Sequence, residues 1–165
     1  MKIRTIILDL SVKFLLPFLG KTKESYLEQG IRDYAERLRR YLPVEIKVLK
    51  EQGRHDPDQV IMAHEAEQLL AQAASASLIV ALDPTGREQT SEAMAAALDD
   101  WGNRGLHTVC FLIGGHLGLD ERVRRQAGLV WSLSRLTFTH EMTRFILLEQ
   151  LYRACSIRAG HNYHK

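Results

Sequence analysis

The chain has little cysteine and almost no net charge. Cys110 and Cys155 are its only cysteines among 165 residues, and each lies in an apolar stretch. This usage excludes the disulfide framework of a small secreted domain and favours a reducing cytoplasm. Lysine and arginine number 22 against 20 aspartates and glutamates, so the net charge is only +2. That balance excludes a histone-like protein, which needs many excess cations to displace counterions, but it is compatible with a local basic patch.

The sequence also lacks a long hydrophobic run. Within residues 1–20, Asp9 and Lys13 interrupt the apolar residues, and no small-residue cleavage site follows. The longest uncharged stretch there, from Phe14 to Gly20, is far too short to cross a bilayer, so we expect no membrane segment. The apolar run instead predicts a buried first strand at Lys13–Leu19. Residues 1–11 have no evident role.

No repeat, linker or low-complexity block divides the chain, which predicts one domain. Apolar runs such as Leu78–Leu82 and Val109–Ile113 are typical of strands covered on both faces. Amphipathic or helix-favouring segments separate such runs, which predicts an α/β fold with a mainly parallel sheet flanked by helices. The expected elements are a strand at 13–19, a helix at 22–41, a strand at 44–48, a helix at 58–74, a strand at 78–82, a turn at 83–86, a helix from a Ser91 cap to about Trp101, a strand at 109–113, a helix from an Asp120 cap to Gln126, a strand at 129–136 and a helix at 141–157.

A glycine loop, Gly114-Gly115-His116-Leu117-Gly118, follows the strand expected at Val109–Ile113. This is the carboxyl end of the strand, where open α/β sheets bind ligands. The spacing is neither the dinucleotide fingerprint nor a phosphate loop with its lysine. The loop alone favours a tight turn without a ligand.

Hydroxyl side chains recur between Ser132 and His140, interrupted by a single charge at Arg135. They are suited to line a pocket for a polar heterocycle. The simpler interpretation is a strand whose hydroxyls face its neighbours, with Thr139 capping the final helix.

The last 31 residues hold five cations and two anions, and they also include His140, Tyr163 and His164. Arginine, histidine and tyrosine in this setting are suited to contact phosphates and to stack on an unpaired base. His140 and Arg144 share a helix face, whereas Arg153 lies about half a turn out of phase, which hints at a site shared across a subunit interface. A solvated basic helix explains the composition equally well.

Other chemistries find little support. Cys155, His161 and His164 give only three adjacent metal-type ligands, so we expect no metal site. The chain also has no G-x-S-x-G motif for serine hydrolase chemistry.

Three segments in this order resemble one family: FLIGGHLGL at 111–119, LSRLTFTH at 133–140, and RFILLEQLYRACSI at 144–157 with the terminal NYHK. They are similar to the bacterial large-subunit ribosomal RNA pseudouridine N3-methyltransferases of the SPOUT superfamily. The segments FLGKTKESYLEQGIRDYAERLRRY and LIVALDPTG extend the resemblance over about residues 12–165. It implies one SPOUT methyltransferase domain with a C-terminal trefoil knot, S-adenosylmethionine as methyl donor and a cytoplasmic homodimer. The implied substrate is a pseudouridine of 23S ribosomal RNA in the assembled ribosome.

The resemblance also assigns residues. Those that it places around the methyl donor are Leu82, Gly114, Gly115, Ser134, Arg135, Leu136, Thr137, Phe138 and Thr139. Those that it places at the reacting base or the RNA are His140, Arg144, Arg153, Tyr163 and His164. Loss of the N3 proton needs a base, for which His140 and His164 are both candidates.

Two positions depart from the family pattern, which commonly has proline where this chain has Thr139 and Asn162. Losing these two fixed φ angles is expected to loosen the donor loop and the tail. The alternative function is therefore a knotted RNA-binding or ribosome assembly factor with weakened catalysis. The family's usual start falls at Val12, so residues 1–11 are expected to be either an extension or a mis-assigned start.

Overall fold

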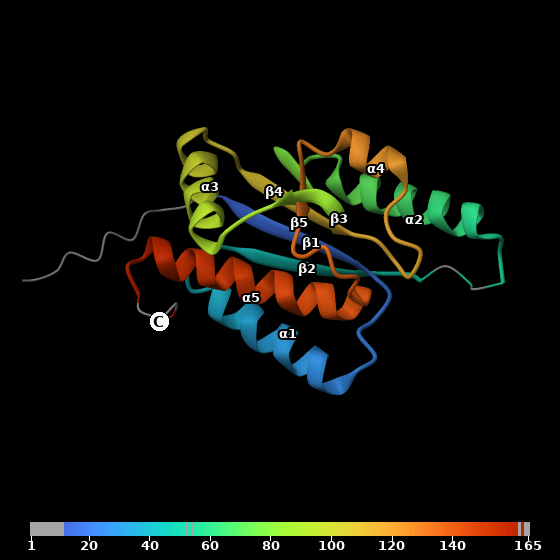
Figure 1. Ribbon diagram of the computed structural model, residues 1–165, viewed down its shortest axis with the longest axis horizontal. Helices are drawn as coiled ribbons and strands as arrows, with labels where there is room; N and C mark the ends of the chain where they lie inside the picture. The colour runs from blue at the N-terminus through green and yellow to red at the C-terminus, as the bar shows by residue number, and fades with distance from the viewer. Residues whose placement is uncertain (1–11, 52, 54, 162, 164–165) are drawn as a thin grey trace, which may run out of the picture.

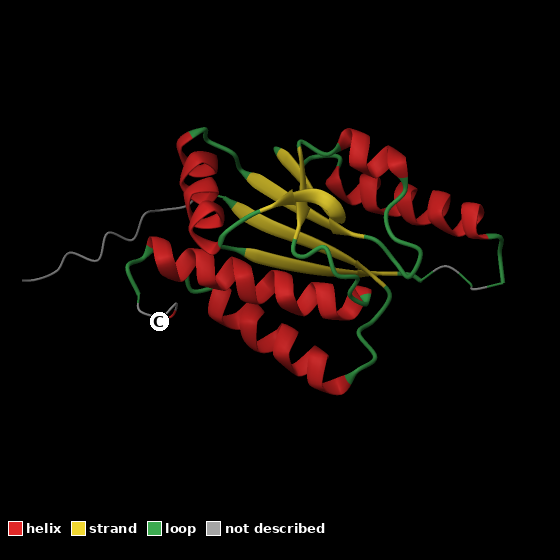
Figure 2. Cartoon of the chain, in the orientation of Figure 1, coloured by secondary structure: helices red, strands yellow, loops and turns green. Residues whose placement is uncertain are grey.

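The structure is a computed structural model that describes residues 12–51, 53, 55–161 and 163 (Figure 2). The expectations for residues 1–11, Asn162 and His164 lie outside the described residues.

Five parallel strands form one sheet in the order β2-β1-β4-β3-β5 (Figure 1). The pairing of β1 with both β2 and β4 places the first strand in the interior of the sheet. The predicted parallel sheet is therefore confirmed. The strands are β1 (Lys13–Leu19), β2 (Val44–Leu49), β3 (Leu78–Glu88), β4 (Thr108–Ile113) and β5 (Leu129–Ser132).

Five helices cover the two faces of the sheet. α1, α3 and α5 pack on one face, and α2 and α4 lie on the other (Figure 1). Side chains alternate along β1 accordingly: Phe14 and Leu16 belong to the core under the first group, and Leu15 belongs to the core under the second. The helices are α1 (Ser25–Leu38), α2 (Asp58–Ala73), α3 (Ser91–Asn103), α4 (Glu121–Gln126) and α5 (His140–Arg158).

Three hydroxyl or carboxyl side chains cap helices. Asp120 accepts from the backbone N–H of Arg122, as predicted. Thr139 accepts from the N–H of Met142, which confirms the capping interpretation of that residue. The predicted Ser91 cap is wrong, because the preceding Thr90 has the extended conformation of an N-cap and accepts from Ala93.

Two strand predictions need correction. The strand expected at 129–136 ends at Ser132, because the chain leaves the sheet edge there and runs as a loop to α5. The turn expected at 83–86 lies within β3, whose pairing to β5 breaks after Leu82 and resumes at Arg87. Gly86 permits this bulge, since a Cβ there would lie 2.7 Å from the carbonyl oxygen of Val130.

Both cysteines are free and buried, and burial raises the pKa of each thiol to about 12. No helix in the described part of the chain is long and apolar enough to span a membrane.

Candidate functional site

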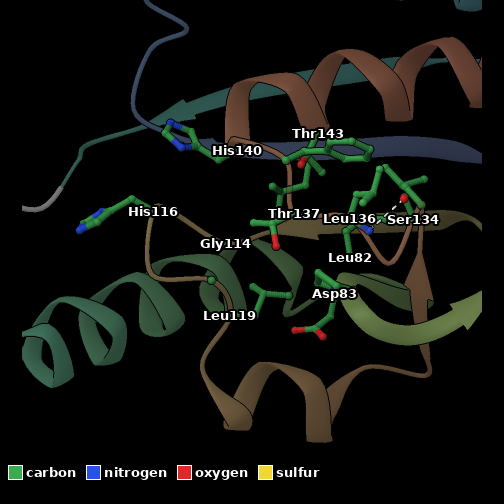
Figure 3. A pocket seen from close by; sticks show the side chains of 16 residues that line it. Leu82, Asp83, Gly114, His116, Leu119, Ser134, Leu136, Thr137, His140 and Thr143 are labelled. Atoms are coloured by element: carbon green, nitrogen blue, oxygen red, sulfur yellow. Dashed lines mark hydrogen bonds between the residues drawn. The ribbon is translucent and has the colours of Figure 1, made fainter.

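The bulge within β3, the loops that follow β4 and β5, and the first turn of α5 meet at one edge of the sheet and enclose a pocket (Figure 3). The parallel arrangement explains this convergence, since it brings the ends of neighbouring strands to one edge. Seven of the nine residues expected at the donor site line the pocket: Leu82, Gly114, Gly115, Ser134, Leu136, Thr137 and Phe138. The other two do not: Arg135 has a side chain 85% exposed and faces Glu88, and Thr139 caps α5.

The glycine loop is too tight for larger residues. A Cβ on Gly114 would lie 2.3 Å from the carbonyl carbon of Gly118, and Gly118 itself has a φ of +83°. The N–H of Gly118 donates to the carbonyl oxygen of Gly115 at 3.1 Å, which closes the turn. Because no side chain covers this part of the wall, the backbone itself is presented to the pocket. The tight turn and the ligand pocket are thus the same feature.

Asp83 also lines the pocket, although the sequence pattern indicated only a turn there. Burial opposes its ionisation, but hydrogen bonds from Thr85 and Arg124 prevail and lower the pKa of Asp83. The Arg124 guanidinium lies 3.1 Å from the carboxylate, so this negative charge is paired. The signal for Asp83 was its place directly after a buried strand, which parallel sheets use for ligands.

The 133–139 loop forms another wall. The Ser134 hydroxyl accepts from the N–H of Leu136 at 3.0 Å and holds a local turn. Leu136 is 70% exposed, an unusual position for a leucine in a chain that buries most of its large apolar side chains. The loop therefore offers both hydroxyls and an uncovered apolar side chain at the pocket.

Two histidines lie at one end of the pocket, His116 from the glycine loop and His140 from the first residue of α5 (Figure 3). His140 is the site histidine expected from the sequence, and His116 was not singled out. Burial and the charge of Arg144 lower the pKa of His140 below its ordinary 6.5. His140 is therefore neutral near pH 7, the form that accepts a proton.

Arg144 lies inside the protein, with 1% of its surface exposed. Its guanidinium donates to the Leu19 carbonyl oxygen at 2.5 Å and to the Thr22 hydroxyl at 3.1 Å, and it stacks over the Phe18 ring at 4.7 Å. Burial lowers the pKa of Arg144 to about 10, so the side chain stays charged at neutral pH. These contacts tie α5 to the end of β1.

Arg153 and Tyr163 form a second group, far from the pocket. The Arg153 guanidinium lies 4.9 Å from the centre of the Tyr163 ring and 2.5 Å from a Glu149 oxygen. The Tyr163 and Tyr34 hydroxyls form a hydrogen bond of 2.8 Å. Burial raises the pKa of Tyr163 well above its usual range. Arg153 is 13 positions beyond His140 on α5, which at 1.5 Å per residue separates their backbones by roughly 20 Å.

The structure thus divides the expected catalytic residues. His140 lies at the pocket, Arg144 is buried behind it, Arg153 and Tyr163 lie together at the other end of α5, and His164 is outside the described residues. Pocket residues to which the sequence assigned no role in donor binding or catalysis are Asp83, Pro84, Ile113, His116, Gly118, Leu119, Leu133 and Thr143. In the part of the chain that the structure describes, no three His, Cys, Asp or Glu side chains are grouped to hold a metal ion.

Proteins of one name are similar to this chain over nearly its whole length. The Ribosomal RNA large subunit methyltransferase H of Desulfotalea psychrophila is 42% identical over 154 residues, covering 93% of this chain and 100% of that protein. The protein of the same name from Acetivibrio thermocellus is 40% identical and covers 89% of this chain and 96% of its own length.

A solved structure shares the fold. The probable methyltransferase from Bordetella pertussis Tohama I superimposes with a TM-score of 0.55 at 14% identity, covering 88% of this chain and 96% of that one. A family model described as "Predicted SPOUT methyltransferase" matches residues 12–164. The chain belongs to the SPOUT methyltransferase family.

Proposed function

We propose that this protein transfers a methyl group from S-adenosylmethionine to N3 of a pseudouridine in 23S ribosomal RNA, within the assembled ribosome in the cytoplasm. The observation that carries the proposal is the pocket at the β3 bulge and the carboxyl ends of β4 and β5, with the neutral His140 at its edge. Full-length similarity to proteins named Ribosomal RNA large subunit methyltransferase H supports the substrate class.

The pocket fits a methyl donor with a polar heterocycle. Leu82, Leu119 and Leu136 supply apolar surface for a flat ring, and Gly114, Gly115 and Gly118 contribute backbone without bulky side chains to the pocket wall. The residues that would hold the donor are Leu82, Gly114, Gly115, Ser134, Leu136, Thr137 and Phe138. Arg135 and Thr139 would support the loop from outside the pocket. When bound, S-adenosylmethionine supplies an electrophilic methyl group.

His140 is the proton acceptor in this proposal. Methyl transfer to N3 releases the N3 proton, and a neutral imidazole at the pocket edge is suited to take it. His164, the other candidate base, belongs to the C-terminal tail. Methyl transfer is an in-line displacement, so the main contribution of the protein is to position the methyl donor and the acceptor nitrogen.

Arg144 has a different role from Arg153. Its burial and its bonds to Leu19 and Thr22 support a positioning residue that holds His140 in place, rather than a direct RNA contact. Arg153 is half-exposed and stacks with Tyr163, so this pair is suited to hold a phosphate or a base.

We further propose a homodimer in which the Arg153–Tyr163 group of one protomer completes the pocket of the other. Separation by roughly 20 Å along α5 prevents both groups from serving one pocket within one chain. The C-terminal trefoil knot is part of this proposal, because the family resemblance implies it.

Mass spectrometry of 23S ribosomal RNA from a deletion strain tests the function. Loss of one methylated pseudouridine, restored by the wild-type gene, is the expected result. Unchanged methylation would contradict the enzyme and favour the knotted assembly factor. Calorimetry with S-adenosylmethionine provides an independent check, because a protein without affinity for it would contradict the donor assignment.

A further inference from the structure

Glu65 is a buried carboxylate that the proposed reaction does not use. It lies on α2 with 5% of its surface exposed, beside Ala66 and Leu69 of the apolar core. Ionisable side chains are rarely buried, because removing a carboxylate from water costs several kcal/mol unless partners compensate. An apolar residue at position 65 would fill the same space without this desolvation cost. The presence of a carboxylate therefore points to a role beyond stability.

The carboxylate touches the glycine loop of the pocket. A Cβ on Gly115 would lie 2.5 Å from Oε1 of Glu65 and 2.7 Å from Oε2, so the carboxylate occupies the place of a side chain at residue 115. Burial raises the pKa of Glu65, and the Gly115 backbone N–H opposes that rise by stabilising the charged form. Glu65 therefore lies one layer behind the pocket wall, in contact with the wall itself.

The charge of Glu65 is not neutralised by a cation in the described part of the protein. Its Oε2 atom is buried without a hydrogen-bond partner among the described residues, and no lysine or arginine forms an ion pair with it there. Asp83, the acid that lines the pocket directly, differs because Arg124 pairs with it at 3.1 Å. His116 and His64 lie near enough to favour the charged form of Glu65, but within the residues that the structure describes the carboxylate has no arginine partner of the kind that pairs with Asp83.

We propose that Glu65 is a positioning residue of the donor pocket that holds the glycine loop at Gly115 and favours a cationic methyl donor over its neutral product. The inference rests on the proposed function. In the transfer the C–S bond of the sulfonium breaks and a C–N bond forms, while the N3 proton passes to the base. The sulfur is left as a neutral thioether, so a negative charge behind the wall attracts the donor and no longer attracts the product.

Calorimetry with two ligands tests the charge. We expect Glu65→Gln to weaken S-adenosylmethionine binding by about tenfold and S-adenosylhomocysteine binding by less than about threefold. Glu67→Gln is the matched control, because Glu67 lies on the same helix and is exposed. An unchanged ratio of the two affinities in Glu65→Gln would overturn the charge assignment, whereas a wild-type protein that binds neither ligand would contradict the proposed function instead.

Hydrogen exchange without any ligand tests the contact with the loop. Glu65→Ala should speed amide exchange in residues 114–118 by about tenfold or more, with Glu67→Ala unchanged, because the loop loses the carboxylate that packs against Gly115. Equal exchange in both variants would overturn the positioning role, whatever the ligand experiments give. Thermal unfolding of each variant establishes that the compared proteins are folded.

Discussion

His140 and Glu141 are neighbours with opposite tasks. Glu141 turns inward, where its carboxylate accepts the backbone N–H groups of Lys23 and Glu24 at 3.0 and 3.1 Å. These bonds overcome the effect of burial and lower the pKa of Glu141, so it stays charged. His140 faces the pocket and is held neutral by burial and by the charge of Arg144. One helix N-terminus therefore supplies both an anchor and a base.

The protonation of His140 predicts the pH dependence of methyl transfer. In the proposed mechanism the neutral imidazole accepts the N3 proton, so activity is expected above the pKa of His140 and is lost as the pH falls through that value. Because this pKa lies below 6.5, the single-turnover rate with saturating ribosomal substrate should stay level near pH 7 and fall only below pH 6.5.

His140→Ala should reduce that rate by about 100-fold or more and remove the acidic limb. His164→Ala is the comparison, since His164 is the other candidate base. A wild-type rate in His140→Ala together with a large loss in His164→Ala would assign the proton to the tail instead.

Thr139 keeps the backbone that the family's proline would impose. Its φ is −62°, within the range of proline, and its hydroxyl adds a cap at 3.2 Å from the Met142 nitrogen. The backbone of Thr139 therefore has the same conformation that proline would fix, so it gives no sign of the expected loosening of the donor loop. Asn162, the other departure, lies outside the described residues.

Substitutions at Thr139 should change the free energy of unfolding through the loss of the hydroxyl cap and through the restriction of φ. Thr139→Ala loses the cap and should lower the free energy of unfolding by about 1 kcal/mol. Thr139→Pro loses the cap but restricts the unfolded chain, so its change should stay under about 1 kcal/mol. Urea denaturation measures both, and Thr90→Ala provides a matched loss of a cap on α3. A Thr139→Ala protein as stable as the wild type would contradict the capping role.

At the scale of elements, the start of α5 is the joint that organises the site. Glu141 and Arg144 together hold the segment from Leu19 to Glu24, which connects β1 to α1. The same helix turn places His140 at the pocket. A disturbance of this joint should therefore affect stability and catalysis together.

Arg144→Ala tests whether the start of α5 is held by the buried guanidinium. The Leu19 carbonyl oxygen and the Phe18 ring would lose their buried partner, so we expect a loss of about 3 kcal/mol in the free energy of unfolding. Arg144→Lys should not restore the wild-type free energy of unfolding, because lysine lacks the planar guanidinium that reaches two acceptors. Arg125→Ala is the control, since that side chain is 77% exposed. Unchanged stability with a large loss of RNA binding would instead identify Arg144 as an RNA contact.

For the whole molecule, the two groups of functional residues lie on one long helix but far apart. The pocket is at the N-terminal end of α5, and the Arg153–Tyr163 group is near its C-terminal end. In a two-fold dimer, the Arg153–Tyr163 group of each protomer would lie at the pocket of the other. Such a dimer would bring the two groups of residues together.

Complementation distinguishes a shared site from a site within one chain. His140→Ala impairs the pocket, and Arg153→Ala impairs the distal group, so each variant alone should have little activity. Co-expression of the two should restore about one quarter of wild-type activity, because half of the dimers are mixed and each mixed dimer has one intact site. A purified mixed dimer without any restored activity would contradict the shared site. A monomer in sedimentation would contradict it as well.

Much of the fold was predictable because local patterns and burial agree. The apolar runs at Leu78–Leu82 and Val109–Ile113 are covered on both faces, and the helix expected at 22–41 buries Leu27, Ile31 and Leu38. The errors lie where long-range contacts decide. Hydroxyl-rich residues beyond Ser132 have strand propensity, yet they leave the sheet to form the pocket wall.

The sequence by itself determined the α/β class, the order of the strands along the chain and the glycine loop. The family resemblance assigned nine residues to the donor site, and seven of them line the pocket. Only the tertiary structure decided which groups act together. His140 and Arg144 share a helix face in the sequence pattern, yet one faces the pocket and the other is buried against Leu19. Glu65 carried no signal, because its significance comes from contact with Gly115, 50 positions away. Periodicity records which side of an element is buried, whereas the partner that buries it is set by the packing of distant segments.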